Sequence, residues 1–378
     1  MPMPPWWKVK RELRRIGRQI ENLPINVFER FLGGHYNDVV LRRKRRIVSG
    51  AQPDGPRKAI YLLYPKDGLL ETHRSAIDYL AGKGLSLTIV SNLPLSTADE
   101  AEILTLCHRY IERPNFGYDF GGYRDAVLAM ADVLPETEAL VLMNDSVWFP
   151  LSEETDWLAD AAALGVDFAG SVSHYGLPHV EAVDFRDMTF DYATDHQHFH
   201  YGSFALLIGP RILRSPGFLS FWRNLRLSTD KKRTVRYGET GLTAWVLANG
   251  YTHGDTLDVA CLHEALAELS ERELRDAAAR IIVFDDLDMR DLMTAPGFRF
   301  EDLSREELIL FLMTAIARQG PGYVPAYLTT LTLGFPFLKK SPAWHNPDAA
   351  GITRHILRTL DTPVARHALD EIDGAVRR

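Results

Sequence analysis

Three residues that follow a buried-looking strand have side chains suited to binding a charged ligand. Asn144, Asp145 and Ser146 come directly after the continuous apolar run 139–143. A carboxylate at this position can bind a divalent cation, and the amide and hydroxyl groups can hydrogen-bond a ligand. In open α/β sheets, ligands bind at the carboxyl ends of the strands. We therefore expect these three residues to lie in a binding site.

Glu239 is a second candidate for chemistry. It stands in the sequence Tyr-Gly-Glu-Thr-Gly, at the expected start of an apolar helix that ends in Asn-Gly-Tyr at residue 251. A carboxylate there can remove a proton from an attacking hydroxyl group as a general base. The alternative is an acid that only stabilises the helix N-terminus through the helix dipole.

A glycine-rich segment, NFGYDFGGYRDA, begins at residue 115. Gly117, Gly121 and Gly122 can adopt conformations that other residues avoid and let a ligand approach the backbone closely. Asp119 and Arg124 lie in the same segment. We predict a ligand-binding loop that carries one acid and one cation, followed by a helix over 123–134.

Three histidines alternate along the chain at positions 196, 198 and 200. On an extended segment their side chains would all face one side, and such a cluster can bind a metal. No further acid-and-histidine spacing completes a metal motif. We therefore favour contacts of His198 and His200 with a bound ligand, or simple exposure to solvent.

Alternating strand and helix patterns supply the framework for these residues. Strands are expected over 59–64, 85–90, 139–143, 166–170 and 203–208, and helices over 69–82, 97–110, 157–164 and 216–225. This βαβα order predicts a parallel sheet with right-handed crossovers. Asn92 is the polar residue that follows the second strand, where a ligand can bind. Residues 255–345 are expected to be mostly helical, with a short strand over 281–284.

Composition predicts a soluble protein of the reducing cytoplasm. The 378 residues are 46% hydrophobic and 25% charged, which is ordinary for globular proteins. The two cysteines, Cys107 and Cys261, are far apart, so neither a disulfide framework nor a zinc site is expected. No apolar run is long enough to span a bilayer, and no leader segment is evident.

The N-terminal segment is strongly basic. Residues 1–46 contain twelve Lys or Arg and four Asp or Glu, a net charge of +8, which leaves −15 for the rest of a chain whose total is −7. Apolar residues recur at helical spacing from Trp6 to Ile20, with basic residues between them. Such a helix can lie on an anionic membrane surface, or pack on the domain with its charged face in water. The run 42–46 could serve the same membrane surface. Nucleic acid is not expected as a partner, because the remainder is acidic and contains no recognised module.

The motifs together resemble the rhamnan synthesis protein F family. The resemblance covers about residues 58–347 and includes NFGYDFGGYRDA, the Asn-Asp-Ser after the strand, HFHYGSFALLIGPRIL, and LGFPFLKKSPAWHNP near residue 340. It implies an α/β fold of the GT-A-like, Rossmann-like type, with a mostly parallel central sheet flanked by helices. The expected organisation is a basic segment over 1–50, a catalytic domain over 57–255, and a mainly helical region over 256–378.

The resemblance also implies a function. The chain would be an inverting glycosyltransferase that moves a sugar, most plausibly L-rhamnose from dTDP-L-rhamnose, onto a lipid-linked bacterial surface polysaccharide. Glu239 would be the base, with Asp119 as the alternative. The donor would contact Asn92, as the candidate for its nucleobase, together with Arg124, residues 144–146 and the three glycines. His198, His200 and Lys339 are acceptor or accessory candidates. Asp145 would hold Mg²⁺ or Mn²⁺.

Two departures from the general GT-A pattern keep other functions open. Asn144-Asp145-Ser146 offers one carboxylate where the general metal motif offers two, and Thr240 replaces a second acid after Glu239. A glycan- or nucleotide-sugar-binding protein without turnover is therefore the alternative hypothesis. A metal-dependent hydrolase that uses the three histidines is a weaker one.

Overall fold

The computed structural model describes residues 36–376 except 176–181, 191, 196–198 and 284–285. Its centre is a twisted, mixed sheet. The strands are β1 (Arg46–Ser49), β2 (Arg57–Leu63), β3 (Ser86–Ser91), β4 (Arg109–Glu112), β5 (Ala139–Asn144), β7 (Phe168–His174), β8 (His200–Tyr201), β9 (Ala205–Ile208) and β10 (His253–Leu257). They are ordered β1-β4-β3-β2-β5-β9-β7-β10, and β8 pairs with β7.

The predicted α/β class, with a central sheet flanked by helices, is confirmed. Strands β4, β3, β2 and β5 are parallel to one another, and β10 is parallel to β7. Strand β9 runs antiparallel between β5 and β7, and β1 runs antiparallel at the edge. The sheet is therefore more mixed than a continuous βαβα reading of the sequence indicates.

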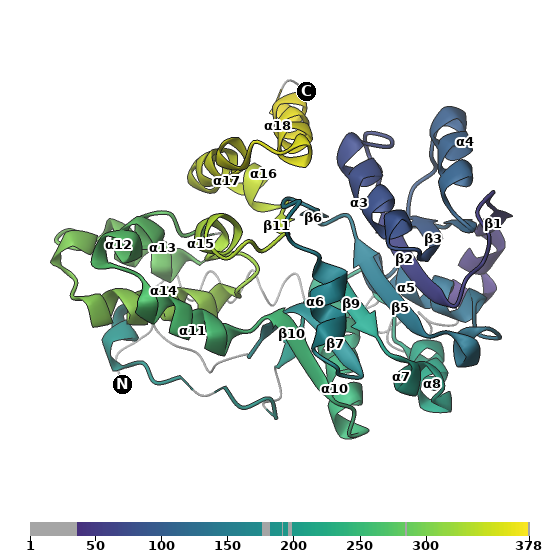
Figure 1. The fold of residues 1–378 in the computed structure, drawn as a ribbon, viewed down its shortest axis with the longest axis horizontal. Helices are drawn as coiled ribbons and strands as arrows, with labels where there is room; N and C mark the ends of the chain where they lie inside the picture. Colours follow the sequence, from purple (N-terminus) through teal and green to yellow (C-terminus); the bar gives the residue numbers. More distant parts are fainter. Residues whose placement is uncertain (1–35, 176–181, 191, 196–198, 284–285, 377–378) are drawn as a thin grey trace, which may run out of the picture.

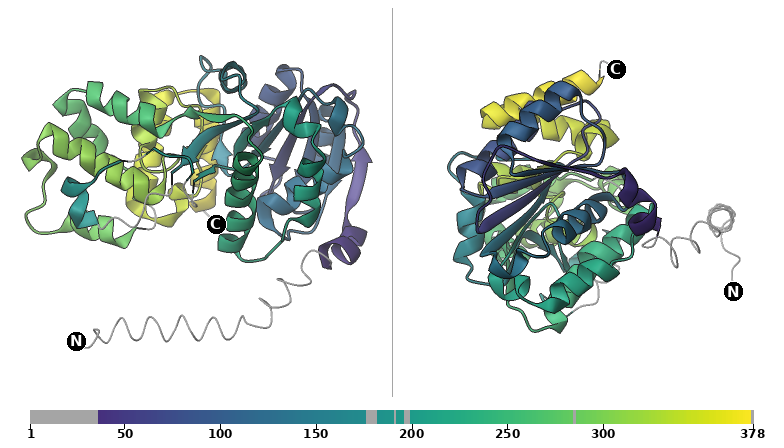
Figure 2. Two further views of the ribbon diagram at one scale, coloured as in Figure 1. Left: turned by 90° about the horizontal axis from the view of Figure 1, so that it is seen from below. Right: turned by 90° about the vertical axis from the view of Figure 1, so that its right-hand side faces the viewer.

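Helices cover both faces of the sheet (Figure 2). One face carries α3 (Glu71–Gly82), α4 (Thr97–Leu106) and α6 (Trp157–Ala163). The other face carries α5 (Tyr118–Ala129), α7 (Pro210–Leu213), α8 (Pro216–Asn224) and α10 (Gly241–Ala248). Side chains alternate across β2, so that Ile60 and Leu62 face the α5 side while Tyr61 and Leu63 face the α3 side.

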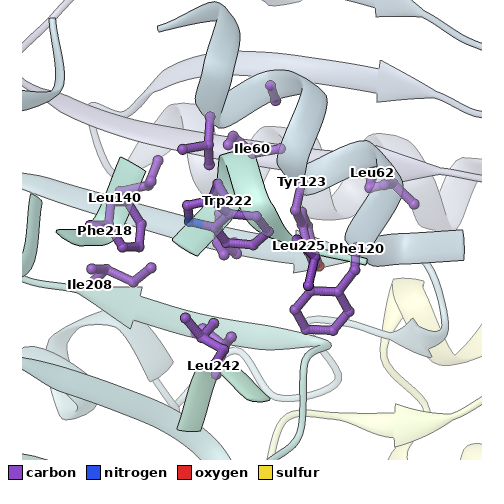
Figure 3. Packing of buried hydrophobic residues seen from close by; sticks show 14 of the residues in the cluster. Ile60, Leu62, Phe120, Tyr123, Leu140, Ile208, Phe218, Trp222, Leu225 and Leu242 are labelled. Carbon is purple, nitrogen blue, oxygen red and sulfur yellow. The ribbon is translucent and has the colours of Figure 1, made fainter. Parts of the chain in front are cut away.

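The core on the α5 side contains several large aromatic residues (Figure 3). Trp222 of α8 is fully buried, and its ring stacks on Phe120 of α5 at 6.0 Å between centroids. Full burial of an apolar side chain stabilises a fold by roughly 1.5–3 kcal/mol. This core therefore fixes α5, and with it the polar residues at the N-terminal end of α5.

The remainder of the chain is helical. It comprises α11 (Val259–Glu268), α12 (Glu271–Ala279), α13 (Leu287–Thr294), α14 (Arg305–Gln319), α15 (Ala326–Leu331), α16 (Pro342–His345), α17 (Pro347–Leu360) and α18 (Pro363–Val376). Figure 1 shows α11–α15 beside the sheet and α16–α18 next to both parts. Helix α17 packs on α15, and α18 packs on α3.

A two-stranded ladder ties this helical region to the end of β5. Strand β6 (Val147–Trp148) follows the Asn-Asp-Ser turn and pairs antiparallel with β11 (Leu338–Lys339). Trp148 is fully buried in the core formed with α16–α18. The segment around residue 340, predicted from the sequence only as a separate motif, therefore lies directly against residues 144–146.

Several element boundaries differ from the prediction. Strands β4 and β10 were not predicted, and the helix expected to reach residue 110 ends at Leu106, because the chain turns into β4. Strand β1 joins the sheet ahead of the linker at which the catalytic domain was expected to begin. No strand forms over the described residues of 281–284. Ile282 instead donates one backbone hydrogen bond to Val324 O.

The predicted glycine-rich loop is largely helix. Only Gly117 of the three glycines has a positive φ, +79°, and Gly121 and Gly122 lie within α5. A Cβ atom on Gly121 would lie 2.0 Å from Phe116 O, and one on Gly122 would lie 2.0 Å from Leu62 Cδ1. These two glycines therefore let α5 approach its own N-terminal turn and strand β2, which is a packing role rather than a loop role.

The basic N-terminal segment falls mainly on residues 1–35, which lie outside the described residues. Part of the second basic run is engaged within the fold. Arg45 forms a 2.9 Å ion pair with Asp125, and Arg46 pairs with Glu100 and, at 3.3 Å, with Glu112. Within the part of the chain that the structure describes, no helix is long and apolar enough to cross a membrane.

Replacement of Gly121 by Ala should destabilise the protein by about 1–3 kcal/mol, because the new methyl group meets the backbone carbonyl of Phe116, which cannot rotate away. Gly351→Ala is the matched control. Gly351 lies in the exposed interior of α17, and no atom lies within 4 Å of the position that its Cβ atom would occupy. Alanine should therefore raise the free energy of unfolding there by up to about 1 kcal/mol. Urea unfolding measures both. Equal changes in the two variants would contradict the packing role.

Candidate active site

The turn after β5 lies where the sheet changes its winding direction. Strands β2 and β5 are adjacent and parallel, α3 after β2 covers one face, and α5 before β5 covers the other. Ligands of open α/β sheets bind in the crevice at such a point. Asp145 joins the two strand ends, because its Oδ2 accepts a 2.7 Å hydrogen bond from Tyr64 N and its own N donates to Leu62 O at 3.1 Å.

His73 supports Asp145 from the first turn of α3. Its Nδ1 accepts a 3.2 Å hydrogen bond from Leu70 N, so the ring proton is on Nε2, which lies 3.5 Å from Asp145 Oδ2. Burial lowers the pKa of His73 well below its usual value, and the charges of Lys340 and Arg74 lower it further. A neutral imidazole therefore faces Asp145. No spacing or motif in the sequence pointed to this histidine.

A second polar network connects the two predicted base candidates. Glu239 Oε1 accepts hydrogen bonds from both the backbone N, at 3.1 Å, and the hydroxyl of Ser203. The carbonyl of Ser203 in turn accepts a 3.0 Å hydrogen bond from the Tyr123 hydroxyl. Asn144 Nδ2 donates to Asp119 Oδ2 at 3.1 Å and lies 3.5 Å from the carbonyl of Ser203. The structure thus brings Asp119, Asn144 and Glu239 together around one serine.

A strained turn positions Asp119. Gly117 and Tyr118 both have positive φ values, +79° and +48°, and Asp119 follows them in the first turn of α5. A left-handed conformation costs a tyrosine roughly 1–2 kcal/mol. The hydroxyl of Tyr118 donates to Thr229 O at 2.9 Å, which helps to hold this conformation.

Glu239 lies on a π-helical turn, Arg236–Thr240, that continues into α10. Such turns occur often at functional sites, because the wider turn displaces one side chain from the regular helical positions. Gly238 is required here, since a Cβ atom at that position would lie 2.3 Å from the ring of Phe120. The same phenylalanine that stacks on Trp222 therefore determines how closely the Glu239 turn approaches α5.

The environment of Asp119 favours its neutral form. Removal of the carboxyl group from water raises its pKa most, and the nearby charges of Glu239 and Asp145 raise it further. Lys339 and Lys231 partly offset this effect, and the resulting pKa is about 6. A carboxyl group with this pKa can exchange a proton near neutral pH.

Two cavities meet at the Asn-Asp-Ser turn. The first, of about 640 Å³, is lined by Asp145, His73 and residues of α3 and α18. The second, of about 520 Å³, is lined by Ser146, Asp119 and Glu239. Lys340 and Trp344 line both. Adjacent residues of one turn therefore face different cavities, and a ligand lying across the turn would contact both.

Of the predicted donor contacts, all of which are described residues, only Asp145 and Ser146 line either cavity, and Arg124 and Asn92 are engaged elsewhere in the fold. The guanidinium group of Arg124 is buried and donates to Asp38, at 2.6 and 2.8 Å, and to Trp222 O. Asn92 is also buried, and its Oδ1 accepts a 2.7 Å hydrogen bond from Arg113. Both side chains hold neighbouring elements together in this structure, so the geometry gives them an architectural role in place of the predicted donor contact.

The remaining predicted residues include two that line the second cavity. The ring of His200 stacks on His174 at 5.4 Å, and Lys339 Nζ lies 4.1 Å from the centre of the Phe204 ring. His196 and His198 lie outside the described residues, so the predicted histidine row stays a prediction. Aromatic and imidazole rings around a polar cavity are suited to a ligand with both apolar faces and hydroxyl groups.

The residues present suit a divalent metal only when a ligand with phosphate groups binds the metal together with the protein. Among the described residues, no group of three or more His, Cys, Asp or Glu side chains could hold a metal ion. Asp145 is the carboxylate at the turn. A Mg²⁺-type ion commonly keeps several waters and is bound by one or two carboxylates together with substrate phosphates. Asp145 therefore fits a metal that the ligand itself mainly holds.

Comparison with known proteins gives a family match. A model of the family described as rhamnan synthesis protein F matches residues 87–282. The chain is also 33% identical over 236 residues to the uncharacterized protein y4gN of Sinorhizobium fredii (strain NBRC 101917 / NGR234). That match covers 62% of this chain and 57% of the relative, so the chain spans somewhat more than half of the relative's length. The family predicted from the motifs is confirmed.

Solved structures with partial similarity include those of two fungal enzymes. One is the mannosyltransferase Ktr4p from S. cerevisiae, with 13% identity, a TM-score of 0.27, and coverage of 51% of this chain and 65% of that chain. The other is core-mannan synthase A from Aspergillus fumigatus in a Mn/GDP form, with 10% identity, a TM-score of 0.30, and coverage of 53% and 71%. At these scores the function of this chain has to be argued from the family and the site.

Asp119→Asn should change stability in a pH-dependent way. The folded-state pKa of about 6 is above the ordinary value of 3.8, so ionised Asp119 disfavours folding. This cost is absent below about pH 4, develops as the pH rises from about 4 to about 6, and is complete above that range. The free energy of unfolding of the variant should therefore be about 1–3 kcal/mol higher than that of the wild type at pH 8, and the two should be equal at pH 4. Urea unfolding at the two pH values measures this. A difference that is the same at both would contradict the assigned environment.

Proposed function

Because the chain belongs to the rhamnan synthesis protein F family, we propose that it is a glycosyltransferase that extends a bacterial surface polysaccharide. The donor is a nucleotide-sugar, for which the family's association with rhamnan favours dTDP-L-rhamnose, and the acceptor is a growing, lipid-linked glycan. The observation that carries the proposal is the position of Glu239. Its carboxylate is held by Ser203 in a cavity that adjoins the turn at the switch point of the sheet.

The reaction is a single displacement with inversion. An acceptor hydroxyl attacks the anomeric carbon of the donor sugar, the new C–O bond forms, and the bond to the diphosphate oxygen breaks. Glu239 receives the hydroxyl proton as general base. Asp119 is the alternative base, since its pKa of about 6 also suits proton transfer. Ser203 keeps the Glu239 carboxylate oriented through two hydrogen bonds to Oε1.

The negative charge that develops on the departing diphosphate needs positive charge nearby. Lys231 and Lys339 line the same cavity as Glu239. A Mg²⁺ or Mn²⁺ ion, when bound, would neutralise part of that charge as a Lewis acid. Asp145 would hold the ion, and the hydrogen bond from Tyr64 N together with the facing His73 would keep the carboxylate in place. Ser146 lines the cavity beside Glu239, and the buried Asn144 holds Asp119 through its hydrogen bond.

Replacement of Glu239 by Gln should lower kcat for sugar transfer by roughly 10²–10⁴-fold, because the amide cannot accept the proton. Binding of the nucleotide-sugar donor should change little. Transfer to an acceptor glycan and donor binding by calorimetry measure the two effects. Glu264→Gln, at an exposed carboxylate of α11, is the control and should retain wild-type turnover. Undiminished turnover in Glu239→Gln would remove this residue as the base.

We further propose that the chain associates with the inner face of the membrane through its basic N-terminal segment. The sequence basis is the net charge of +8 over residues 1–46, together with Trp6 and Trp7. Attraction to anionic lipid contributes about 1 kcal/mol per basic residue near the surface. Arg45 and Arg46 are already paired with acids of the fold, so the basic residues before them would supply most of the attraction. A lipid-linked acceptor would be reached at the same surface.

Substitution of glutamine for the six basic residues Lys8, Lys10, Arg11, Arg14, Arg15 and Arg18 in the full chain should weaken binding to vesicles that contain anionic lipid. The loss should be at least tenfold, and it should be smaller at high salt because exposed charges are then screened. Vesicle co-sedimentation measures it. The exposed arginines Arg272 of α12 and Arg358 of α17, changed to glutamine, form the control. Equal binding by the wild type and the six-residue variant would overturn the membrane proposal.

A further inference from the structure

Lys340 is tied by its backbone to the Asn-Asp-Ser turn. The β6–β11 ladder pairs Trp148 with Leu338 and Val147 with Lys339, and the next residue, Lys340, donates a 3.0 Å backbone hydrogen bond to Ser146 O. A segment close to the C-terminus is thus fixed beside the turn that ends β5. Any movement of Lys340 away from the turn would break this ladder.

The ammonium group of Lys340 is also held in place. Nζ lies 3.3 Å from Glu371 Oε2 and 3.4 Å from the hydroxyl of Thr72, and the side chain is only 12% exposed. Glu371, from α18, accepts further hydrogen bonds from Trp148 Nε1, at 2.9 Å, and from the Thr72 hydroxyl. Groups from α3, β6 and α18 therefore fix one cation at the boundary between the two cavities.

The charges around the first cavity show why a cation at this point matters. Its carboxylates outnumber its lysines and are Asp67, Glu71, Asp145, Asp370 and Glu371. Of the two lysines, Lys66 follows β2, while Lys340 adjoins the turn and lines both cavities. An anionic ligand that crosses the turn needs a local positive charge to offset these carboxylates. Two unit charges 4 Å apart interact by about 4 kcal/mol at the effective dielectric constant near a protein surface.

We propose that Lys340 is the fixed cation that binds the diphosphate group of a nucleoside diphosphate ligand, and that Glu371 is the anion that holds Lys340 when no ligand is bound. This inference rests on the proposed nucleotide-sugar site and names the residue that recognises its diphosphate. When the bond from the anomeric carbon to the diphosphate breaks, its electron pair stays on the leaving oxygen, and Lys340 offsets that charge. The single carboxylate in Asn144-Asp145-Ser146 fits this arrangement, since a lysine directly after the neighbouring strand β11 supplies charge that does not depend on a metal.

The test is calorimetric binding of inorganic pyrophosphate and of dTDP to the full chain in EDTA, and again with Mn²⁺. Lys340→Met removes the charge and keeps the length of the side chain, and it should weaken both probes roughly 10- to 100-fold in EDTA. Lys340→Arg should stay within a few fold of the wild type. Glu371→Gln removes the competing anion and should bind pyrophosphate about two- to tenfold more tightly. Lys44→Met, at an exposed lysine that lines neither cavity, should change binding by less than about threefold.

Lys340→Met should weaken binding of pyrophosphate, whereas Glu371→Gln should strengthen it. These opposite changes in affinity distinguish a ligand-binding role of Lys340 from a structural one. If the ion pair only stabilises the fold, both variants should weaken binding together, and the assignment of Lys340 falls. Equal binding by the wild type and Lys340→Met would also overturn it, while leaving the nucleotide-sugar site intact. Failure of the wild type to bind either probe, with or without Mn²⁺, would instead overturn the proposed donor site. Should Lys340→Met fail to fold, Lys340→Arg and Glu371→Gln decide the question by the same criteria.

Discussion

The parallel pairing of β2 with β5 is the constraint on which the site depends. Asp145 closes the end of this pair, since it accepts a hydrogen bond from Tyr64 N while its own N donates to Leu62 O. Because the helices before and after these strands lie on opposite faces of the sheet, the space above the strand ends is open. Two groups of residues border that opening. The hydrogen-bond network of Ser203 and Glu239 lies on one side, and the β6–β11 ladder that leads to Lys340 lies on the other.

The local part of this arrangement could be predicted from the sequence. Continuous apolar runs indicate strands buried on both faces, and they located β2, β3 and β5 within a residue or two. The polar residues after β5 then follow from the rule that ligands bind at strand ends. Short strands cannot be predicted in this way. Four residues, as in β4, are too few to show a period, and their place in the sheet is set by the neighbouring strands.

The start of α5 was predicted as a loop, because tertiary packing there overrides the low helix propensity of glycine. Glycines at positions 121 and 122 favour a loop by propensity, but the contacts at Phe116 O and Leu62 leave no room for a side chain on this helix. Arg124 looked like a ligand contact for a similar reason. Its role as an anchor for Asp38 and α8 depends on elements that are distant in sequence. His73 and Lys340 reach Asp145 from α3 and from the β11 segment, and only the fold reveals that they converge.

The site also retains groups that oppose folding. Asp119 is removed from water beside Glu239, and Tyr118 holds a left-handed conformation just before it. Neither feature stabilises the core on the α5 side, which is stabilised by the buried rings of Phe120 and Trp222. Strain and like-charge proximity of this kind persist where the surrounding structure holds them in place. Proton transfer at neutral pH is served by a carboxyl group with a pKa near 6, whereas ligand binding alone does not require one. In the proposed displacement, the same arrangement places two carboxyl groups that can receive the hydroxyl proton within one cavity, and this supports turnover in preference to binding alone.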